Sequence, residues 1–418
     1  MSTVIQSRLP EIADALNDQA VAEQWLLAPA ATGAAFGVYV HVPFCEHICQ
    51  YCDFNTYAGL SPLIPDYVEA VEREIALQAG DFAGRSAISL FLGGGTPSQL
   101  SAEQVGRIIT AAHEAFDFAP DAEVTIETNP NDLNEAYCAS LLDAGVNRLS
   151  IGGQTLDRRG LRTLGRQHEA TDTLRSLADA HRAGFRNVSL DFIYGWPGQT
   201  AERWRSDLAL ILSGADGGTT PAHLSLYSLI VEPGTPMADA VTRGILTPAD
   251  DDTAADFAEI AQEVLAEAGW LHYEIANWAC APSFVSRHNA IYWRNGDYAG
   301  IGAGAHGHRK QQRVMNQPSP QRYIAALEAD VIPRTNVEQI DEATAIGETM
   351  MLGLRLLTAG VSRDAFLRRH GVDIDAVFAE PIARMSAQGL LVDEGYAIRL
   401  TERGAMLANV VAAEFLPA

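Results

Sequence analysis

The chain has 418 residues, of which 47% are apolar, so it can bury the cores of two or more domains. Its 29 Lys and Arg against 53 Asp and Glu give a formal net charge of −24, which repels phosphate backbones and argues against broad binding to nucleic acid or anionic membranes. Five cysteines, three of them close together, do not resemble a disulfide framework, so we expect a protein of the reducing cytoplasm.

The N-terminal segment lacks the marks of export. Residues 1–25 are polar with a helical pattern and have no charged start followed by an apolar run, as a signal peptide would. Residues 26–42 are apolar but interrupted by Pro29, Gly33 and Gly37, and they never reach the ~20 uninterrupted apolar residues that a membrane span needs. We predict a loosely attached extension with one helix over residues 1–34 and no membrane span.

From Gly37 onward, short β-rich segments alternate with longer helical patterns, which is typical of parallel βα units. Asp or Ser residues cap several helix starts, and Gly145, Gly184 and Gly214 mark helix ends. The predicted strands are Val38–Val42, Ile88–Leu92, Glu123–Thr128, Arg148–Gly152, Val188–Tyr194 and His223–Ile230. The predicted helices lie near residues 65–79, 101–117, 132–144, 157–164, 170–183 and 201–213.

Six βα units within residues 37–232 are too few for a closed barrel, which takes eight strands and about 250 residues. We therefore predict an α/β fold with a partial (β/α)6 barrel over residues 35–247. Active sites of such barrels lie at the carboxyl ends of the strands. Side chains that follow the strands should therefore meet at one mouth.

Three cysteines, Cys45, Cys49 and Cys52, follow the first strand within eight residues. Spacings of three and two residues place the sulfurs on one tight loop, as an iron–sulfur cluster requires. A [4Fe-4S] cluster held by three cysteines leaves one iron with an open position, which could bind a small molecule. A Cys₃His zinc site that uses His41 or His47 is an alternative, although structural zinc ligands usually recur at a second place in the chain.

The other predicted strands also end in unusual residues. Gly93–Gly95 follow the second strand, where the absence of Cβ atoms lets backbone approach a ligand, and Thr96 adds a hydroxyl. Each of the remaining polar residues could bind a ligand or serve as an ordinary capping or ion-paired residue. This set is Glu127, Gln154, Arg166 and Asp191.

Residues 248–418 change to an α+β pattern. A helix from Pro248 to Ala268 comes first, and the glycines of Tyr298–His306 suggest a close backbone crossing near a ligand or another strand. Helices near 321–329, 340–357, 362–370 and 375–388 precede a hairpin over Leu390–Leu400. We predict a smaller C-terminal domain with a winged-helix-like module, which without a basic face is more suited to docking than to reading DNA.

The cysteine motif resembles that of the radical S-adenosylmethionine (SAM) superfamily, whose signature is C-x3-C-x2-C with an aromatic residue before the last cysteine, here Tyr51. The resemblance implies that the open iron binds the amino and carboxylate groups of SAM. The cofactors would then be a [4Fe-4S] cluster and SAM.

A closer resemblance runs from about Gly37 to the C-terminus. Gly-Gly-Gly-Thr-Pro-Ser, Glu-x-Asn-Pro, Arg148-Leu-Ser-Ile-Gly-Gly-Gln154 and Asp191-Phe-Ile-Tyr-Gly-Trp-Pro-Gly resemble the oxygen-independent coproporphyrinogen III oxidase group. The resemblance implies a SAM pocket made by Tyr39, Tyr51, Gly94, Gly95, Thr96, Glu127, Gln154, Arg166 and Asp191.

One departure favours a particular branch of that group. The true oxidases extend the motif to a fourth cysteine, and Phe54 stands at that position here. The version Cys-Asp-Phe-Asn is similar to that of the heme chaperones of the HemW type, and Ser286-Arg-His288-Asn-Ala-Ile-Tyr292-Trp293 carries their H-N-x-x-Y-W motif. The resemblance implies heme binding at His288, whereas the residues alone would also fit a structural histidine in an aromatic setting.

The sequence therefore favours a cytoplasmic chaperone that carries the cluster and SAM, binds heme as cargo and passes it to an acceptor protein. The alternative is a radical enzyme of porphyrin metabolism, in which the reduced cluster cleaves SAM and the resulting radical attacks a propionate side chain. Whether the chain turns over a substrate is left open by the sequence. A structural cluster protein is the third possibility, and neither the acceptor nor the electron donor can be identified.

Overall fold

The computed structural model describes residues 35–214 and 218–417, so the extension predicted over residues 1–34 lies outside the described residues. The described residues form two compact units. The barrel unit contains residues 35–264 and 297–340, and the smaller unit contains residues 265–296 and 341–417. The predicted domain division at residue 248 stays a prediction.

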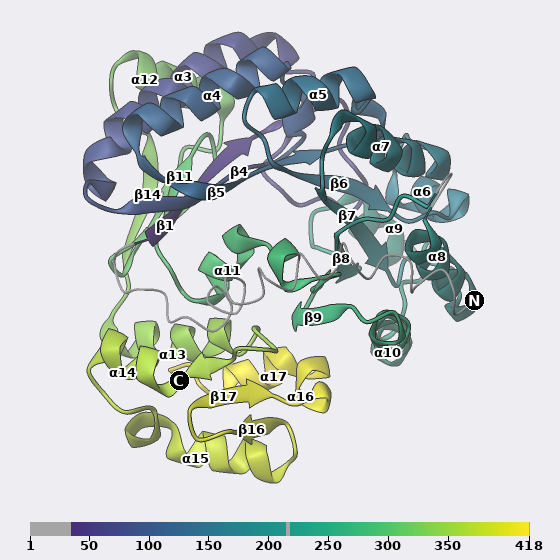
Figure 1. Ribbon diagram of the computed structural model, residues 1–418, viewed down its shortest axis with the longest axis vertical. Helices are drawn as coiled ribbons and strands as arrows, with labels where there is room; N and C mark the ends of the chain where they lie inside the picture. The colour runs from purple at the N-terminus through teal and green to yellow at the C-terminus, as the bar shows by residue number, and fades with distance from the viewer. Residues whose placement is uncertain (1–34, 215–217, 418) are drawn as a thin grey trace. The chain divides into compact units, whose positions relative to one another are not determined.

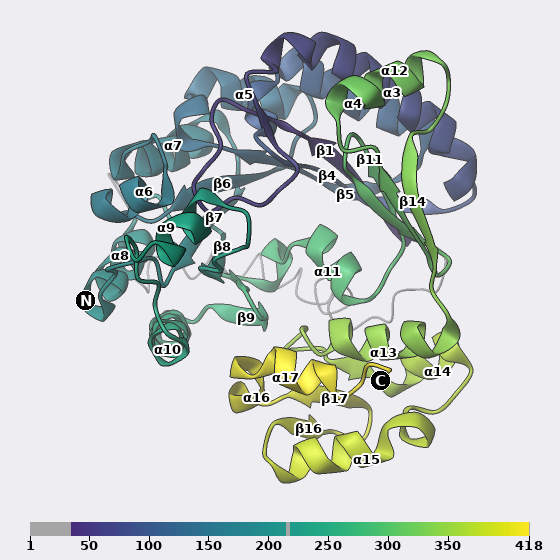
Figure 2. The ribbon, with the colours of Figure 1, turned by 180° about the vertical axis from the view of Figure 1, so that it is seen from behind.

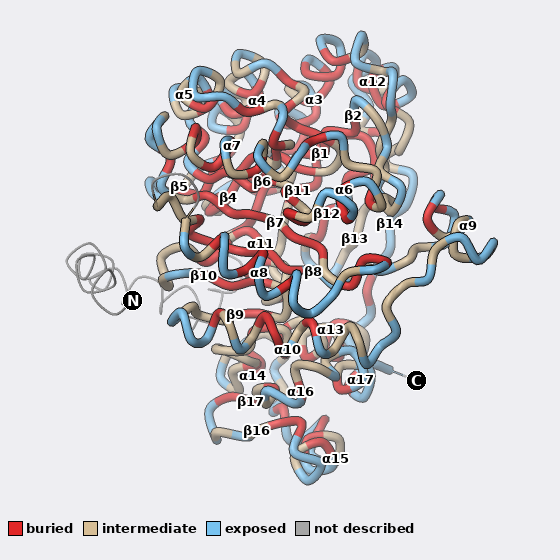
Figure 3. The backbone as a smooth tube through the Cα atoms, turned by 90° about the vertical axis from the view of Figure 1, so that its right-hand side faces the viewer, coloured by how far each residue is buried: buried red, intermediate tan, exposed pale blue. Residues whose placement is uncertain are grey.

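The barrel unit is built on six parallel strands in the order β1-β4-β5-β6-β7-β8. All six strands predicted from the sequence are confirmed, and most of their residues are buried (Figure 3). The bounds are β1 Ala35–Val42, β4 Ser86–Gly94, β5 Asp117–Thr128, β6 Arg148–Gln154, β7 Asn187–Tyr194 and β8 His223–Ser228.

The predicted helices between these strands are confirmed, and α3, α4, α5 and α7 cover the outer face of the sheet (Figure 1). Local signals fix their ends: Ser101 and Gln104 form a capping box at the start of α4, and Gly184 ends α7 with a φ of 116°. The bounds are α3 Ile64–Gln78, α4 Ala102–Ala115, α5 Glu135–Asp143, α6 Arg158–Leu164, α7 Ala170–Ala183 and α8 Ala201–Ser213. Helices α9 (Pro236–Thr242) and α10 (Asp251–Glu267) follow, the latter where a helix was predicted.

The sequence analysis did not foresee that the sheet continues beyond β1. Strand β11 (Tyr298–Ile301) pairs with β1 in parallel, and β12 (His306–Arg309), β13 (Gln312–Asn316) and β14 (Arg334–Gln339) add antiparallel strands (Figure 2). Helix α12 (Pro320–Glu328) connects the last two of these strands. Residues more than 250 positions apart therefore become neighbours at the first strand.

The glycines after β11 allow the close crossing that the sequence predicted. Gly302 has a φ of 102°, and a Cβ atom there would lie 2.5 Å from the carbonyl oxygen of His41. A Cβ atom on Gly304 would collide with the side chain of Asn55. The segment therefore lies directly against the chain that leads into and out of the cysteine loop.

Glu74 of α3 holds this crossing in place through hydrogen bonds. Its buried carboxylate accepts hydrogen bonds from the backbone NH of Gly302 at 2.7 Å, from Asn316 Nδ2 at 2.7 Å and from the Tyr323 hydroxyl at 2.6 Å. Glu74→Ala would leave these donors unsatisfied, so we expect a loss of about 2–4 kcal/mol in the free energy of unfolding.

Urea denaturation of the variant against the parent measures this loss. Glu72→Ala on the same helix is the control, because Glu72 forms a salt bridge with the partly exposed Arg107 at 2.6 Å. Equal denaturation midpoints for the two variants would contradict a special role for Glu74.

The smaller unit combines helices with two small groups of strands. The predicted hairpin is confirmed as β16 and β17, and β15 adds a third strand that the sequence analysis missed. That this module is a winged helix stays a prediction. The bounds are β9 Leu271–Glu274, β10 Asn277–Ala279, α11 Arg287–Trp293, α13 Glu342–Gly353, β15 Val361–Ser362, α14 Arg363–His370, α15 Ile374–Ala387, β16 Leu391–Asp393, β17 Ala397–Leu400, α16 Glu402–Met406 and α17 Ala408–Ala413.

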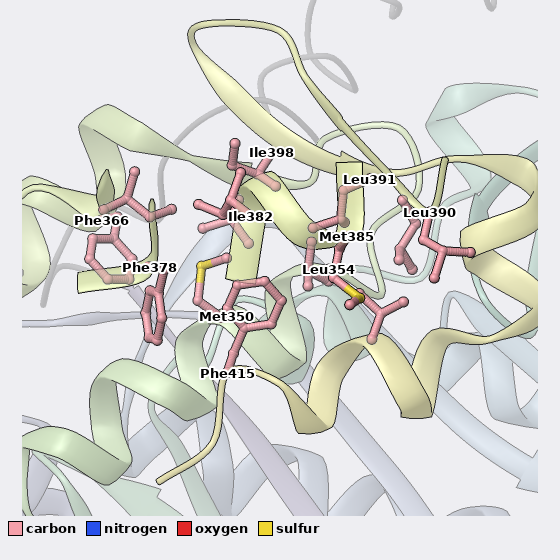
Figure 4. Packing of buried hydrophobic residues seen from close by; sticks show 14 of the residues in the cluster. Met350, Leu354, Phe366, Phe378, Ile382, Met385, Leu390, Leu391, Ile398 and Phe415 are labelled. Carbon is pink, nitrogen blue, oxygen red and sulfur yellow. The ribbon is translucent and has the colours of Figure 1, made fainter. Parts of the chain in front are cut away.

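This unit has its own hydrophobic core. Phe366, Phe378 and Met350, from three helices, point toward one another, and the rings of Phe378 and Phe415 have centroids 5.2 Å apart (Figure 4). No helix among the described residues is long and apolar enough to cross a membrane.

Candidate functional site

The cysteine loop, residues 45–52, lies at the carboxyl end of β1. Cys45 is buried at the end of the short strand β2 (Phe44–Cys45), which pairs with β3 (Tyr57–Ala58), and Cys49 and Cys52 are partly exposed. A turn brings the last two together, because the backbone NH of Cys52 donates to the carbonyl of Cys49 at 3.2 Å. All three cysteines line one cavity of about 470 Å³.

Asn55 ties the end of this loop to the segment after β11. Its side-chain amide donates to the carbonyl oxygens of Ala303 and Pro318, both at 3.0 Å. The backbone carbonyl of Asn55 accepts a hydrogen bond from Nε2 of His41 at 2.9 Å, so Nε2 carries the proton of the neutral ring. The Tyr39 hydroxyl, 2.9 Å from Nδ1, therefore donates to that nitrogen. The sequence analysis quoted Asn55 in its motif but assigned it no role, since its partners lie about 250 residues away.

The three glycines after β4 allow close approach to the cysteine loop. Gly94 has a φ of 113°, and a Cβ atom there would collide with the ring of His41. The backbone NH of Thr96 donates to the carbonyl of Phe44 at 2.8 Å, and its hydroxyl donates to the sulfur of Cys45 at 3.4 Å. The glycines therefore let this segment lie against His41 and the cysteine loop, and its approach to a ligand stays a prediction.

Two carboxylates face the cavity from neighbouring parts of the sheet. Glu127 accepts from the backbone NH of Gly94 at 2.9 Å, and Asp191 accepts from the hydroxyls of Ser150 at 2.8 Å and Ser189 at 3.0 Å. Burial raises the pKa of Glu127 to about 7 and also raises the pKa of Asp191. Glu127 can therefore change charge near neutral pH, and both carboxylates offer acceptor oxygens to a ligand.

Arg166 places a positive charge in the same cavity. Its guanidinium donates to the side chain of Asn129 at 2.6 Å, to the carbonyl of Gly152 at 3.0 Å and to the sulfur of Cys49 at 3.5 Å. Gln154, at the end of β6, also lines the cavity and has a φ of 63°, which is unusual for a residue other than glycine. Asn129 belongs to the Glu-x-Asn-Pro motif that begins at Glu127, but it was not predicted as a site residue.

The structure brings together most of the residues predicted to bind ligands. Tyr39 is not among the described residues that line the cavity, because its ring packs against Phe91. The lining includes the three cysteines and eight of the nine residues of the predicted SAM pocket: Tyr51, Gly94, Gly95, Thr96, Glu127, Gln154, Arg166 and Asp191.

His288 lies in the smaller unit on α11. Its side chain is buried, and Nε2 lies 2.8 Å from the hydroxyl of Tyr292 one turn later. Trp293, the last residue of the motif, has the guanidinium of Arg355 over its ring, 4.5 Å from the centroid. The helix thus brings the histidine and tyrosine of the motif into direct contact.

The donor set of the cavity includes three thiols on one short loop, which suits an iron–sulfur cluster. Among the described residues, no three His, Cys, Asp or Glu side chains converge on a point that could hold one ion. Both nitrogens of His41 are hydrogen-bonded, so this histidine is not poised to complete a zinc site. His47 donates from Nε2 to the carbonyl of Gly165 at 3.1 Å, and its Nδ1 has no hydrogen-bond partner among the described residues. A cubane needs no such convergence, because its irons bind separate thiolates.

The mouth of the cavity has an apolar rim. Phe54 is 66% exposed and lines the cavity beside the cysteines. It stands at the position of the fourth cysteine in the motif of the oxidases that the sequence resembles. Ile48, Tyr227 and Ile230 are also exposed and line the same mouth. The fourth thiol of an oxidase-type motif is therefore replaced by a bulky apolar group.

Comparison with known proteins identifies relatives over nearly the whole chain. The model of the radical SAM superfamily matches residues 39–211, and that of the HemN C-terminal domain matches residues 340–407. The heme chaperone HemW of Bacillus subtilis is 36% identical, with 90% of this chain and 98% of that protein covered, and HemW of Escherichia coli is 32% identical, with 91% and 97% covered. Among solved structures, this chain is similar to coproporphyrinogen III oxidase (HemN) from Escherichia coli, which is a radical SAM enzyme. The TM-score is 0.76 at 23% identity, and the match covers 95% of this chain and 93% of the oxidase chain, which shows a shared fold.

Proposed function

The chain belongs to the HemW heme chaperone family within the radical SAM superfamily, and on that premise we propose that it binds heme and transfers it to an acceptor protein. The observation that carries the proposal is 36% identity to a heme chaperone over 98% of that protein's length. Phe54 supports it, because it stands where the oxidases of the same group carry a fourth cysteine.

The cofactors are a [4Fe-4S] cluster and SAM, as membership of the radical SAM superfamily implies. We assign the cluster to Cys45, Cys49 and Cys52, which leaves one iron for the amino and carboxylate groups of SAM. When reduced, such a cluster supplies an electron to the bound SAM. Thr96 and Arg166 would support this site, since each donates a hydrogen bond to a cysteine sulfur.

The cavity offers SAM groups of both signs. Glu127 and Asp191 provide acceptors for ribose hydroxyls or an amino group, whereas Arg166 and Gln154 provide donors for a carboxylate. Gly94 and Gly95 let the ligand approach the backbone. Tyr51 would pack at the edge of the site, and Tyr39 would act through His41 rather than by direct contact.

Loss of either carboxylate should weaken SAM binding. For Glu127→Gln and Asp191→Asn we expect a loss of about 10- to 100-fold in affinity, because each change leaves polar ligand atoms without a charged partner in a closed site. The affinity of the parent should fall as the pH is lowered through about 7, because Glu127 then takes up a proton.

Calorimetry on anaerobically reconstituted protein measures these affinities. The control is Glu103→Gln, an exposed carboxylate in the first turn of α4, which should bind SAM as the parent does. Unchanged affinity in both cavity variants would refute the assigned SAM site.

We assign heme binding to the helix with the H-N-x-x-Y-W motif. Neutral imidazole is a common axial ligand of heme iron, and His288 could bind through Nε2 if the Tyr292 hydroxyl releases that nitrogen. Trp293 offers an apolar surface for the porphyrin. This assignment places the heme site in the smaller unit, on different elements from the cluster residues.

One preparation can test the function against its alternative. Reconstituted protein loaded with heme is mixed with an apoprotein that changes its spectrum on heme uptake, such as apomyoglobin, and a second portion is assayed with coproporphyrinogen III and a reductant. We expect heme transfer and no decarboxylation. Decarboxylation without heme transfer would establish the oxidase alternative instead.

The cellular setting follows from the cofactors. An oxygen-sensitive cluster needs a reducing environment, so we propose that the protein acts in the cytoplasm, receives electrons from a donor protein and delivers heme to an acceptor. Its charge of −24 suits neither nucleic acid nor an anionic membrane as partner.

A further inference from the structure

The interior of the barrel beneath the cavity is unusually polar. Barrel interiors are normally filled by branched apolar side chains. Here the strand registers place Arg148 of β6 opposite Thr125 of β5, and Ser189 of β7 opposite His223 of β8. Two residues nearer the mouth, on the same face of the sheet, Glu127 pairs with Ser150 and Asp191 with Ser225. A polar layer therefore lies directly under the two carboxylates of the site.

Arg148 carries the charge of this layer. The residue is only 2% exposed, and it is not among the described residues that line the cavity. Its guanidinium contacts Nδ1 of His223 at 3.3 Å, and its Nε makes no hydrogen bond. A buried guanidinium is costly unless opposite charges lie nearby, and the carboxylates of Glu127 and Asp191 provide them.

The neighbours of Arg148 connect it to Asp191 through hydrogen bonds. Ser189 Oγ lies 2.8 Å from Nδ1 of His223 and 3.0 Å from a carboxylate oxygen of Asp191. His223 is itself fully buried, and burial together with Arg148 keeps its pKa well below the usual value, so it remains neutral. Arg148 is thus the cation of this layer.

Charged and polar groups surround the two carboxylates, Glu127 and Asp191. Glu127 faces Asp191 and Arg148. Burial, and after it the charge of Glu127, raise the pKa of Tyr39, so the Tyr39 hydroxyl stays protonated. Asp191 faces Arg148 and the hydroxyls of three serines, Ser150, Ser189 and Ser225. Burial and mutual repulsion favour protonation of Glu127, whereas Arg148 opposes it.

We infer that Arg148 is a positioning residue of the SAM site. Its charge, on the side of the two carboxylates away from the cavity, keeps Glu127 and Asp191 ionised, and its side chain does not touch the ligand. The inference rests on the proposed assignment of those two carboxylates to SAM binding. Without the cation, two carboxylates in one closed interior would tend to share a proton, and a protonated carboxyl is a poorer partner for an amino group or for ribose hydroxyls.

The test is the pH dependence of SAM affinity, measured by calorimetry from pH 6 to 9 on reconstituted protein. For Arg148→Met we expect the midpoint of the pH dependence to move upward by about one unit, with a loss of about fivefold in affinity at pH 7 that is recovered near pH 9. Arg148→Lys keeps the charge and should keep the parent's midpoint. Arg148→Gln is a second neutral variant if the methionine variant does not fold.

His223→Asn is the matched control, because it removes the imidazole that Arg148 contacts and leaves the guanidinium in place. It should retain the parent's midpoint. The inference is overturned if Arg148→Met has the same pH midpoint as the parent. It is also overturned if His223→Asn shifts the midpoint as far as Arg148→Met does, because the shift would then come from altered packing and not from the lost charge. Unchanged SAM affinity in Glu127→Gln and Asp191→Asn would refute the SAM assignment instead.

Discussion

Replacing Cys45, Cys49 or Cys52 with alanine is expected to reduce the iron content of anaerobically reconstituted protein from about four per chain to near zero. Three thiolates on one short loop are the protein ligands of the proposed cluster, and the cavity offers no fourth thiol that could take the place of a missing one. Iron and sulfide analysis, together with the visible absorption of the cluster, measures the loss.

The chain provides matched controls for this experiment. Cys138 is buried in α5 and Cys280 lies in the smaller unit, so alanine at either position should leave the iron content at the parent's value. If the triple variant of the cysteine loop retains the parent's iron, or if the protein takes up stoichiometric zinc instead, the cluster assignment is wrong.

Changing His288 to alanine is expected to weaken heme binding by about 100-fold or more, because the axial bond to iron is removed. The parent for this comparison is the cluster-free Cys45→Ala protein, since the proposed heme ligand lies on other elements than the cysteine loop. Heme titration of that protein should show a saturable spectral change near one heme per chain. The same titration of the double variant should not saturate in that range.

Two further variants separate ligation from loss of structure. His272 is another histidine of the smaller unit, stacked on Trp278 with ring centroids 4.0 Å apart, and His272→Ala should keep most of the heme affinity. Tyr292→Phe removes the hydroxyl that lies 2.8 Å from His288 Nε2 and should bind heme at least as well as the parent. Equal heme affinity with and without the His288 side chain would mean that the iron ligand is a different residue.

The sequence predicted the strands, the helices and most of the site because their signals are local. Alternating β-rich and helical segments specify βα units, and parallel strands place the residues that follow them at one edge of the sheet. This rule brought Glu127, Gln154 and Asp191 together with the cysteine loop, and the cavity contains all of them. Arg166, which follows helix α6 rather than a strand, also lines the cavity. Tyr39, which came from the motif resemblance, does not line this cavity, and its ring packs against Phe91, so its part in the SAM site stays a prediction.

By itself, then, the sequence determined the three-cysteine loop and the six strands of the barrel, since spacing and residue type along short segments are enough to fix them. The branch indicated by Phe54 followed from the resemblance to a known family. Only the tertiary structure decided that β11 extends the sheet beside β1, that Asn55 is held by carbonyls about 250 residues away, and that Arg148 lies beneath two carboxylates. These features depend on strand register and on the folding of distant segments against one another. A shift of one residue in register would turn each side chain to the opposite face, so local pattern cannot specify which charges meet inside the barrel.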